Sequence, residues 1–375
     1  MSSSSPKALV AMVVLFFFTN NLSGSFLPIY FRDQGLSVTE IVTILLFTFI
    51  VLGFVPVAFL KLVKNFEKVI SVGIFMTMLF YVALIWIKSP LILGLAQGVS
   101  LATFWPSFNL LQFRLGSAKT RARTISLYSS IIPSIAGIVG PATGGIIIQN
   151  FSFTSVFIVA VALYLIAFLL SFRVPYKPEA NDFSILRNRM FAIFFTSFII
   201  VGLSETYWLA YPFLLYNISG TILNMGLVLA VTGILISAIT FSINWASDIK
   251  KTRIKFAVIG TVLSAMWYFG VGFATSTSQI MALSLLSGFA NAFRISWFAH
   301  YGDSFTNSQY ASILVMMETG LMVGRIVNLA PTYIFVSQAN YAGYFILLGI
   351  VILSLIPLYL ISKNNAKNND RADSH

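Results

Sequence analysis

Apolar runs of about twenty residues, separated by short polar breaks, follow one another along almost the whole chain. A helix of about that length crosses a hydrocarbon layer of about 30 Å. Twelve such runs predict transmembrane helices, at residues 8–31, 39–60, 69–87, 91–112, 124–147, 154–173, 190–214, 222–245, 254–274, 278–299, 310–335 and 341–362. The pattern therefore predicts an all-α integral membrane protein.

Composition excludes several classes of protein. The 375 residues are 58% hydrophobic and 9% charged, whereas a soluble domain is about 25% charged. A soluble enzyme, a disordered chain and a secreted disulfide scaffold are therefore excluded. With no cysteine and two histidines, the chain offers no thiolate or multi-histidine metal centre, so we expect no metal and no cofactor. No Gly-Lys-Ser/Thr phosphate loop is present, which argues against ATP as the energy source.

The basic residues predict the orientation in the membrane. Of the 23 lysines and arginines, two (Arg32 and Lys88) fall on one side, two (Arg294 and Arg325) fall inside helices, and all the others share the side of the chain termini. Because basic loops stay in the cytoplasm, we expect a plasma-membrane protein with both termini cytoplasmic. The net charge of +12 thus reflects topology, and nucleic acid is not an expected partner.

The second half of the chain repeats the first at an offset of about 185 residues. Pro212 aligns with Pro28, which places Glu205 opposite Asn21. The repeat predicts two bundles of six helices, residues 1–173 and 190–375, joined by a charged cytoplasmic linker at 174–189. In transporters with such repeats, the solute binds between the halves near the middle of the membrane.

One segment carries a local resemblance to a known family. Residues 137–145 read Gly-Ile-Val-Gly-Pro-Ala-Thr-Gly-Gly, with Gly137, Gly140, Pro141, Gly144 and Gly145 at the fixed positions. This resembles the G-x-x-G-P-x-x-G-G motif of proton-coupled drug antiporters of the major facilitator superfamily, and the resemblance extends over residues 8–362. The small residues leave one helix face bare for close packing, and the proline bends the helix. Close packing alone and a role in antiport are both open interpretations.

Two other motifs of that family are degenerate. Lys64 stands where the loop between the second and third helices usually carries Asp, and only the second half keeps the acid, as Asp248. In the fourth helix, Gly94 replaces an arginine that the family's drug antiporters use in proton coupling. Arg121 and Arg123, in the loop after the fourth helix, could form gating ion pairs with Asp248 or simply be solvated loop residues.

Four ionisable residues lie inside the predicted helices, at a cost of about 2.5–3.5 kcal/mol each, so each needs a partner or a water-filled cavity. Glu205 and Arg325 both lie roughly 22 Å from the basic ends of their helices, and Arg294 and Glu318 about 10–13 Å. Equal depths predict the charge pairs Glu205–Arg325 and Arg294–Glu318. A carboxylate in a poorly solvated site favours its protonated form, which makes Glu205 the best candidate for a proton carrier. The alternative is that both pairs only hold helices together.

The family resemblance implies that the first, fourth, seventh and tenth helices line a central cavity. Polar and aromatic residues recur on these helices at helical spacing and are candidate solute contacts: Asn20, Asn21, Gln97, Trp105, Asn109, Gln112, Trp208, Tyr211, Asn291 and Trp297. For the tryptophans, packing in the core or against lipid is an equal alternative.

Together these patterns predict a secondary transporter that works by alternating access. Its partners would be a small organic solute, protons and the lipid bilayer, and we expect a monomer without enzymatic activity. The glycine motif and the aromatic cavity favour proton-coupled efflux of amphipathic compounds. The buried arginines and amides favour the alternative, a proton symporter or uniporter for an organic anion or a sugar-like solute.

Overall fold

A computed structural model of the chain describes residues 6–63, 68–115, 127–128, 132–174, 189–205, 207–250 and 253–362. The described residues are helical or lie in short turns between helices. The first half contains α1 (Pro6–Ser23), η1 (Gly24–Phe26), α2 (Leu27–Asp33), α3 (Val38–Leu62), α4 (Val69–Trp86), α5 (Pro90–Leu115), α7 (Ile132–Asn150) and α8 (Phe153–Ser171). The second half contains α9 (Arg189–Glu205), α10 (Tyr207–Ser219), α11 (Ile222–Lys250), α12 (Arg253–Gly272), α13 (Thr277–Asp303), η4 (Asn307–Gln309), α14 (Tyr310–Ser337) and α15 (Tyr341–Leu353).

These helices correspond to the twelve predicted runs, so the predicted all-α membrane fold is confirmed. Within the described ranges, eleven helical segments are long and apolar enough to cross a membrane. The first predicted helix is the segment α1–η1–α2, and the seventh is the pair α9–α10. The fifth predicted helix corresponds to α7, whose described part begins at Ile132.

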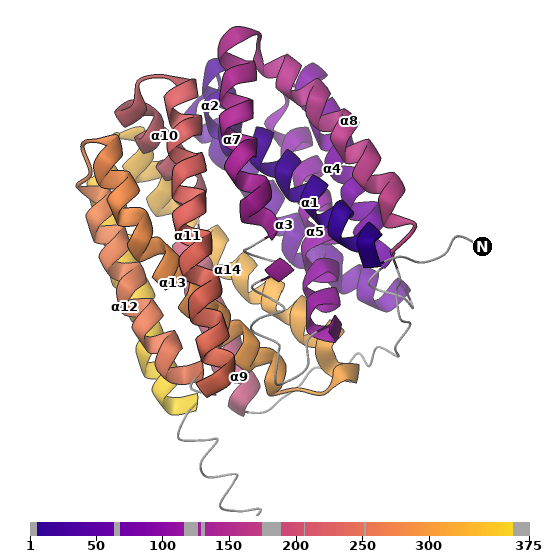
Figure 1. Ribbon diagram of the computed structural model, residues 1–375, viewed down its shortest axis with the longest axis vertical. Coiled ribbons are helices and arrows are strands. Elements are labelled where there is room, and N and C mark those ends of the chain that lie inside the picture. The colour runs from indigo at the N-terminus through magenta and orange to yellow at the C-terminus, as the bar shows by residue number, and fades with distance from the viewer. Residues whose placement is uncertain are drawn as a thin grey trace, which may run out of the picture.

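The two ends of the molecule differ in chemistry. We call the end that carries Lys7, Arg114, Arg189 and Arg253 the basic side, and the opposite end the far side. In Figure 1 the far side, with α2 and α10, is at the top. On the far side, Ser37, Ser152, Ser276 and Asn340 cap the first turns of α3, α8, α13 and α15 with side-chain oxygens that accept backbone N–H bonds. Such caps fix where a helix begins.

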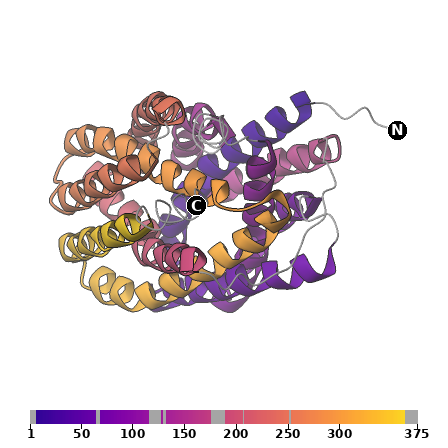
Figure 2. The same cartoon turned by 90° about the horizontal axis from the view of Figure 1, so that it is seen from below.

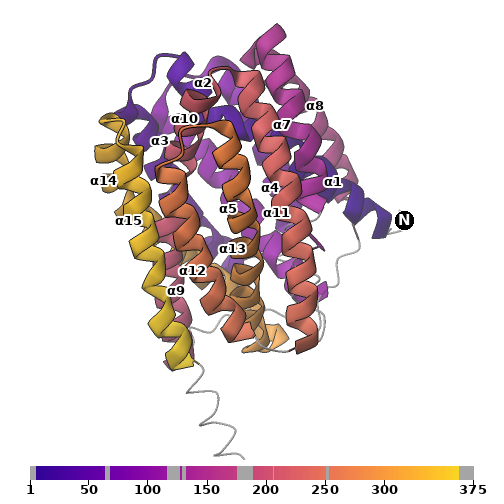
Figure 3. The ribbon, with the colours of Figure 1, turned by 60° about the vertical axis from the view of Figure 1, so that its left-hand side comes forward.

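Helices pack mainly within their own half of the chain. In the first half α1 contacts α7 and α8, and α5 contacts α3 and α4; in the second half α12 lies between α13 and α15, as Figure 3 shows. Viewed from the basic side, the two halves lie next to each other (Figure 2). The division into bundles 1–173 and 190–375 stays a prediction, and residues 175–188 of the linker lie outside the described residues.

Two helix pairs make most of the contact between the halves: α7 with α11, and α3 with α14. The predicted repeat exchanges these pairs, because it places α7 over α14 and α3 over α11. At the first contact a Cβ on Gly145 would lie 3.1 Å from the Ile222 carbonyl oxygen, and at the second a Cβ on Gly53 would overlap Met322. Glycine therefore allows close approach at both contacts.

Aromatic contacts join the halves at both ends. On the far side, the Arg32 guanidinium lies 5.8 Å from the Phe213 ring centroid. On the basic side, Phe113 of α5 contacts Phe298 of α13 and Tyr310 of α14, with ring centroids 4.8 and 5.3 Å apart. The middle sections of the helices lie between these two levels of contact.

Candidate functional site

A bend in one helix and a buried acid in another mark the middle of the molecule. α1 ends at Ser23 and gives way to the 3-10 turn η1 before α2 begins. In the second half, the described parts α9 and α10 belong to one membrane-spanning segment, Arg189–Ser219, and Glu205 is the last described residue of α9. The repeat aligns Asn21 with Glu205, so the bend and the acid fall at nearly corresponding positions. In transporters built from such repeats, the solute site lies near the middle of the membrane.

The end of α9 is held closely against α14. A Cβ on Gly202 would overlap the Leu321 carbonyl, and a Cβ on Gly324 would lie 2.6 Å from the Leu203 nitrogen. The two backbones are thus in direct contact just before Glu205. This crossing brings residues 203–205 to the same depth as residues 325–328.

At that depth Arg325 lies between two carboxylates. Its Nη2 and Nε donate to Oε2 of Glu205 at 2.5 and 3.1 Å, so the expected Glu205–Arg325 ion pair is present. Its Nη1 donates to Oε2 of Glu318 at 3.4 Å. All three side chains are largely buried, with 7% (Arg325), 14% (Glu205) and 5% (Glu318) exposed. We call these three residues the ion cluster.

Glu318 has a different described partner from the one that the sequence predicts. It lies seven residues before Arg325 on the same helix, and two long side chains on one helix face can bridge two turns. The predicted Arg294–Glu318 pair cannot be placed, because the Arg294 side chain lies outside the described residues.

Aromatic rings of both halves cover the guanidinium of Arg325. Its Cζ lies 5.4 Å from the Trp208 ring centroid and 5.8 Å from that of Phe49, and the two rings are 6.2 Å apart. Cation–π attraction at this range contributes about 0.5–2 kcal/mol, more where water is excluded. Because Phe49 belongs to α3 and Trp208 to α10, the ion cluster touches both halves of the protein.

A network of polar side chains that the sequence did not predict holds the end of α9. Asn328 Nδ2 donates to the Leu203 carbonyl at 2.5 Å and to the Tyr344 hydroxyl at 3.1 Å. The Tyr268 hydroxyl donates to the Ser204 carbonyl at 2.7 Å. These bonds tie the last described turn of α9 to α12 and α14 through side-chain donors, which satisfy polar backbone groups inside a membrane. The sequence signal that could have predicted this network is Asn328 itself, because it is an amide one turn after Arg325 in an apolar helix.

Trp297 packs in the core of the second half, which is the alternative that the sequence left open for the tryptophans. It is 2% exposed, and its Nε1 donates to Ser197 Oγ at 3.0 Å. Its ring packs against Tyr359, in the helical residues after α15, and against Phe194 of α9, with centroids 4.4 and 4.7 Å apart. Its role as a solute contact stays a prediction.

The other predicted contacts differ in what they touch. Gln97 Oε1 accepts from Thr48 at 3.2 Å and so faces α3, while Gln112 is 1% exposed. Trp208 is more exposed than the other candidates. The remaining ones are partly buried: Asn20, Asn21, Trp105, Asn109, Tyr211 and Asn291. Their roles as solute contacts stay predictions.

The glycine motif of α7 serves two interfaces. Gly140 and Gly144 face α1, where a Cβ on Gly140 would lie 3.0 Å from the Phe18 carbonyl oxygen. On the other side, Gly145 and the Pro141 carbonyl face Gly226 of α11. Gly137 lies within α7, but its contacts are not among those described. Arg121, Arg123 and the side chain of Asp248 lie outside the described residues.

The packing around Gly94 explains why this position does not carry the arginine of the drug antiporters. A Cβ there would lie 2.6 Å from the Ile44 carbonyl oxygen and 2.8 Å from Phe47. The α3 and α5 backbones are too close at this point for any side chain.

Comparison with known proteins identifies the family. Residues 9–248 match the Major Facilitator Superfamily. The chain belongs to the major facilitator superfamily. It is a multi-pass membrane protein, and its family consists of secondary transporters, not of enzymes.

Solved major facilitator structures share this fold over nearly the whole chain. The E. coli fucose:proton symporter FucP, in its N162A form, has a TM-score of 0.69 at 15% identity and covers 95% of this chain and 98% of its own. The human organic anion transporter MFSD10 has a TM-score of 0.65 at 12% identity, with 94% and 98% covered. At these identities the similarity concerns the fold.

Two curated relatives are similar in sequence over part of their length. An uncharacterised protein in the sodM 3' region of Geobacillus stearothermophilus is 30% identical over 144 residues, which are 35% of this chain and 64% of that protein. The uncharacterised protein YqgE of Bacillus subtilis (strain 168) is 24% identical over 180 residues, 43% of this chain and 40% of its own. The chain thus matches less than two thirds of either relative.

Proposed function

We propose that this transporter couples the movement of a small organic solute to protons, and that the ion cluster is the coupling site. The supporting observation is that, among the described side chains, two buried carboxylates share one guanidinium. A proton on Glu205 removes one of the two negative charges and leaves Arg325 paired with Glu318 alone. Protonation thus weakens the bond between α9 and α14 without leaving a buried charge unpaired.

The same change reaches the first half of the protein. Arg325 lies over Phe49 of α3, so its position depends on both carboxylates and on the contact between the halves. An equilibrium between two conformations shifts when a ligand, here a proton, binds one of them more tightly. Loading and release of a proton at Glu205 would in this way favour different arrangements of α3 against α14.

Export of amphipathic compounds is the first candidate for the direction of transport. The glycine motif of α7, which resembles that of drug antiporters, forms the contacts with α1 and α11. The aromatic rings of Trp208 and Phe49 beside the ion cluster suit a solute with an apolar face.

Proton symport of a sugar-like solute or an organic anion is the second candidate. The fold is similar to that of a fucose:proton symporter and to that of an organic anion transporter. Arg325 could also exchange one of its carboxylates for an anionic solute group.

Proteoliposomes that contain the purified protein and an internal pH dye test coupling. Addition of a cation such as ethidium, of fucose, or of an anion that stays ionised, such as benzenesulfonate, should change the internal pH only when protons are coupled to that solute. Glu205→Gln should abolish the pH change, while Glu40→Gln, at an exposed acid on the far side, should leave it intact. A pH change that survives in Glu205→Gln would contradict the proposed role of Glu205.

We also propose that the protein works as a monomer in the plasma membrane, with both termini in the cytoplasm. The distribution of lysine and arginine supports this orientation. Because the chain has no cysteine, a single cysteine introduced at Thr275 on the far side can be labelled in whole cells. A membrane-impermeant maleimide should label it; protection until the cells are opened would reverse the proposed orientation.

A further inference from the structure

A cavity that is separate from the ion cluster opens at the far side between the two halves. Its volume is about 520 Å³, within the range of about 300–1,000 Å³ that small-molecule sites occupy. The first half lines it with the ends of α2 and α7 and the start of α8, and the second half with the end of α10 and the start of α11. None of the three residues of the ion cluster lines it.

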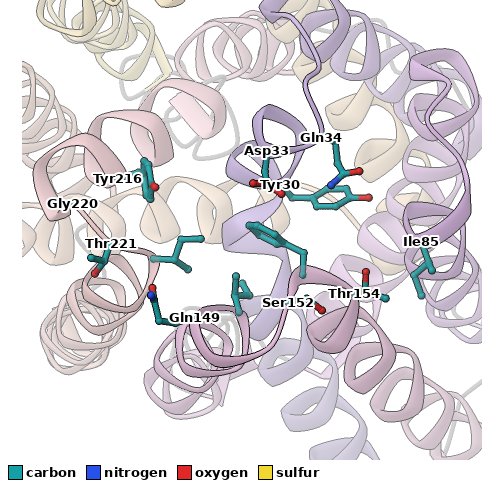
Figure 4. A pocket seen from close by; sticks show the side chains of 13 residues that line it. Tyr30, Asp33, Gln34, Ile85, Gln149, Ser152, Thr154, Tyr216, Gly220 and Thr221 are labelled. Carbon is teal, nitrogen blue, oxygen red and sulfur yellow. The ribbon is translucent and has the colours of Figure 1, made fainter.

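The walls of this cavity carry one charge. Asp33 is the one ionised group among the lining residues, and it forms no ion pair with the described residues. Its neighbour in sequence, Arg32, does not line the cavity and lies over the Phe213 ring. Figure 4 shows Asp33, Tyr30 and Gln34 together on one wall, with Tyr216, Thr221 and Gln149 across the opening.

Three aromatic rings line the cavity together with that exposed carboxylate. The hydroxyl of Tyr30 donates to the Leu84 carbonyl at 2.5 Å, so it is already engaged, and the ring forms part of the wall. Phe153 lies beside it, with centroids 5.4 Å apart, and Tyr216 contributes a third ring from the other half. A carboxylate among aromatic faces attracts an organic cation, because the ring faces carry negative charge density.

We propose that this far-side cavity binds a small organic ammonium ion, and that Asp33 provides its counter-charge. The amide and hydroxyl groups of Gln34, Gln149 and Thr221 would solvate the rest of such a ligand. An organic anion finds no lysine or arginine on the described walls.

The position of the cavity gives the ligand a regulatory effect. The cavity lies near the close contact of α7 and α11, where a Cβ on Gly226 would lie 3.4 Å from the Gly145 Cα. Ile148 and Ile222, three and four residues from those glycines, line the cavity from opposite halves. Any movement that separates the halves at the far side divides the site. A bound cation therefore stabilises the arrangement of the halves seen in this structure and slows transport, because it binds one conformation only.

Binding of benzyltrimethylammonium to the purified protein tests the chemistry of the site. Calorimetry should detect this cation, and should show no binding of the uncharged benzyl alcohol or the anionic benzoate. Asp33→Asn should weaken binding at least tenfold. Glu40→Gln, which changes another exposed far-side acid outside the cavity, should leave it unchanged. Equal binding to both variants would overturn the proposal.

Cysteine protection locates the site independently and does not depend on Asp33→Asn being stable. With no native cysteine, Thr221→Cys provides one thiol on the cavity wall, and Thr275→Cys provides one exposed on the same side but outside it. Benzyltrimethylammonium should slow maleimide labelling at position 221 about fivefold and leave position 275 unchanged. Equal rates with and without the cation at position 221 would overturn the location.

Transport kinetics separate this site from the solute site. The cation should inhibit transport non-competitively, and Asp33→Asn should remove the inhibition while transport continues. Competitive inhibition would mean that the cation binds at the solute site, and would overturn the proposal. Because the binding and labelling measurements involve no proton flux, they stand whether or not the ion cluster couples protons.

Discussion

The first helix near Ser23 and the seventh near Glu205 occupy corresponding positions in the repeat but are stabilised in different ways. In the first, the side-chain donors bond within their own helix: Asn21 donates to the Phe17 carbonyl at 2.8 Å, and Ser23 to the Thr19 carbonyl at 2.8 Å. In the seventh, the donors come from other helices, with Asn328 of α14 and Tyr268 of α12 bonded to carbonyls of α9.

This difference separates a local bend from a junction between helices. The donors near Ser23 bond to the backbone of their own helix, and Ser23 also bonds to the Tyr81 side chain of the same half. The last turn of α9, in contrast, is bonded to α12 and α14, and through the ion cluster it depends on charge. A proton or a solute that alters one of those partners can therefore move the segment around Glu205, whereas the bend near Ser23 should follow the bundle that contains it.

Removal of Arg325 should have the largest effect and tests the comparison most severely. Arg325→Leu leaves Glu205 and Glu318 without their cation, and breaking a buried pair in this way costs about 3–5 kcal/mol. We expect a large fall in the stability of the purified protein towards denaturant, and loss of transport. Arg325→Leu combined with Glu205→Gln and Glu318→Gln should recover most of the stability without transport. No recovery in the triple variant would show that packing, not charge, dominates at this position.

Removal of the amide of Asn328 should have the next largest effect. Asn328→Leu leaves the Leu203 carbonyl and the Tyr344 hydroxyl without this partner, at a cost of about 1–3 kcal/mol. Because the change lies next to Glu205, we also expect the pH dependence of transport to shift. Asn328→Asp keeps the shape but loses the amide donor, so it should shift the pH dependence as well. A loss of stability with an unchanged pH profile would reduce Asn328 to a packing role.

Tyr268 and Tyr301 form a matched pair for a smaller effect. Each buried hydroxyl donates to a backbone carbonyl, Tyr268 to Ser204 at 2.7 Å and Tyr301 to Ile313 at 2.6 Å. Substitution of either by phenylalanine should cost about 1 kcal/mol, measured by denaturant unfolding. Only Tyr268→Phe should weaken the coupling of solute to protons in proteoliposomes, since the Ser204 carbonyl that Tyr268 bonds is next to Glu205 in the chain. Equal effects of both variants on coupling would remove the distinction.

The sequence was sufficient for the fold and for one ion pair, and the reasons are physical. The length of an apolar run defines a spanning helix, and equal depth in two helices brought Glu205 and Arg325 together. Equal depth also paired Glu318 with Arg294 of another helix, although the long side chain of Arg325 on the same helix can reach Glu318. Helical spacing gave the face of Trp297 but not which helices cover that face. Asn328 was missed because the search for buried polar groups considered only ionisable residues, whereas a neutral amide can hold a helix end equally well.

The smallest effect should come from the bend in the first helix. In Asn21→Ala the side-chain bond to the Phe17 carbonyl is lost, but that bond lies within one helix and competes with ordinary backbone bonding. We therefore expect a change in stability of no more than about 0.5–1 kcal/mol, and coupling equal to that of the unchanged protein. Asn21→Asp is the sharper variant, because it places an acid at the position that the repeat aligns with Glu205. If Asn21→Asp in a Glu205→Gln background restored proton coupling, the two positions would be chemically equivalent, and the contrast between a local bend and a junction would rest on the position of charge alone.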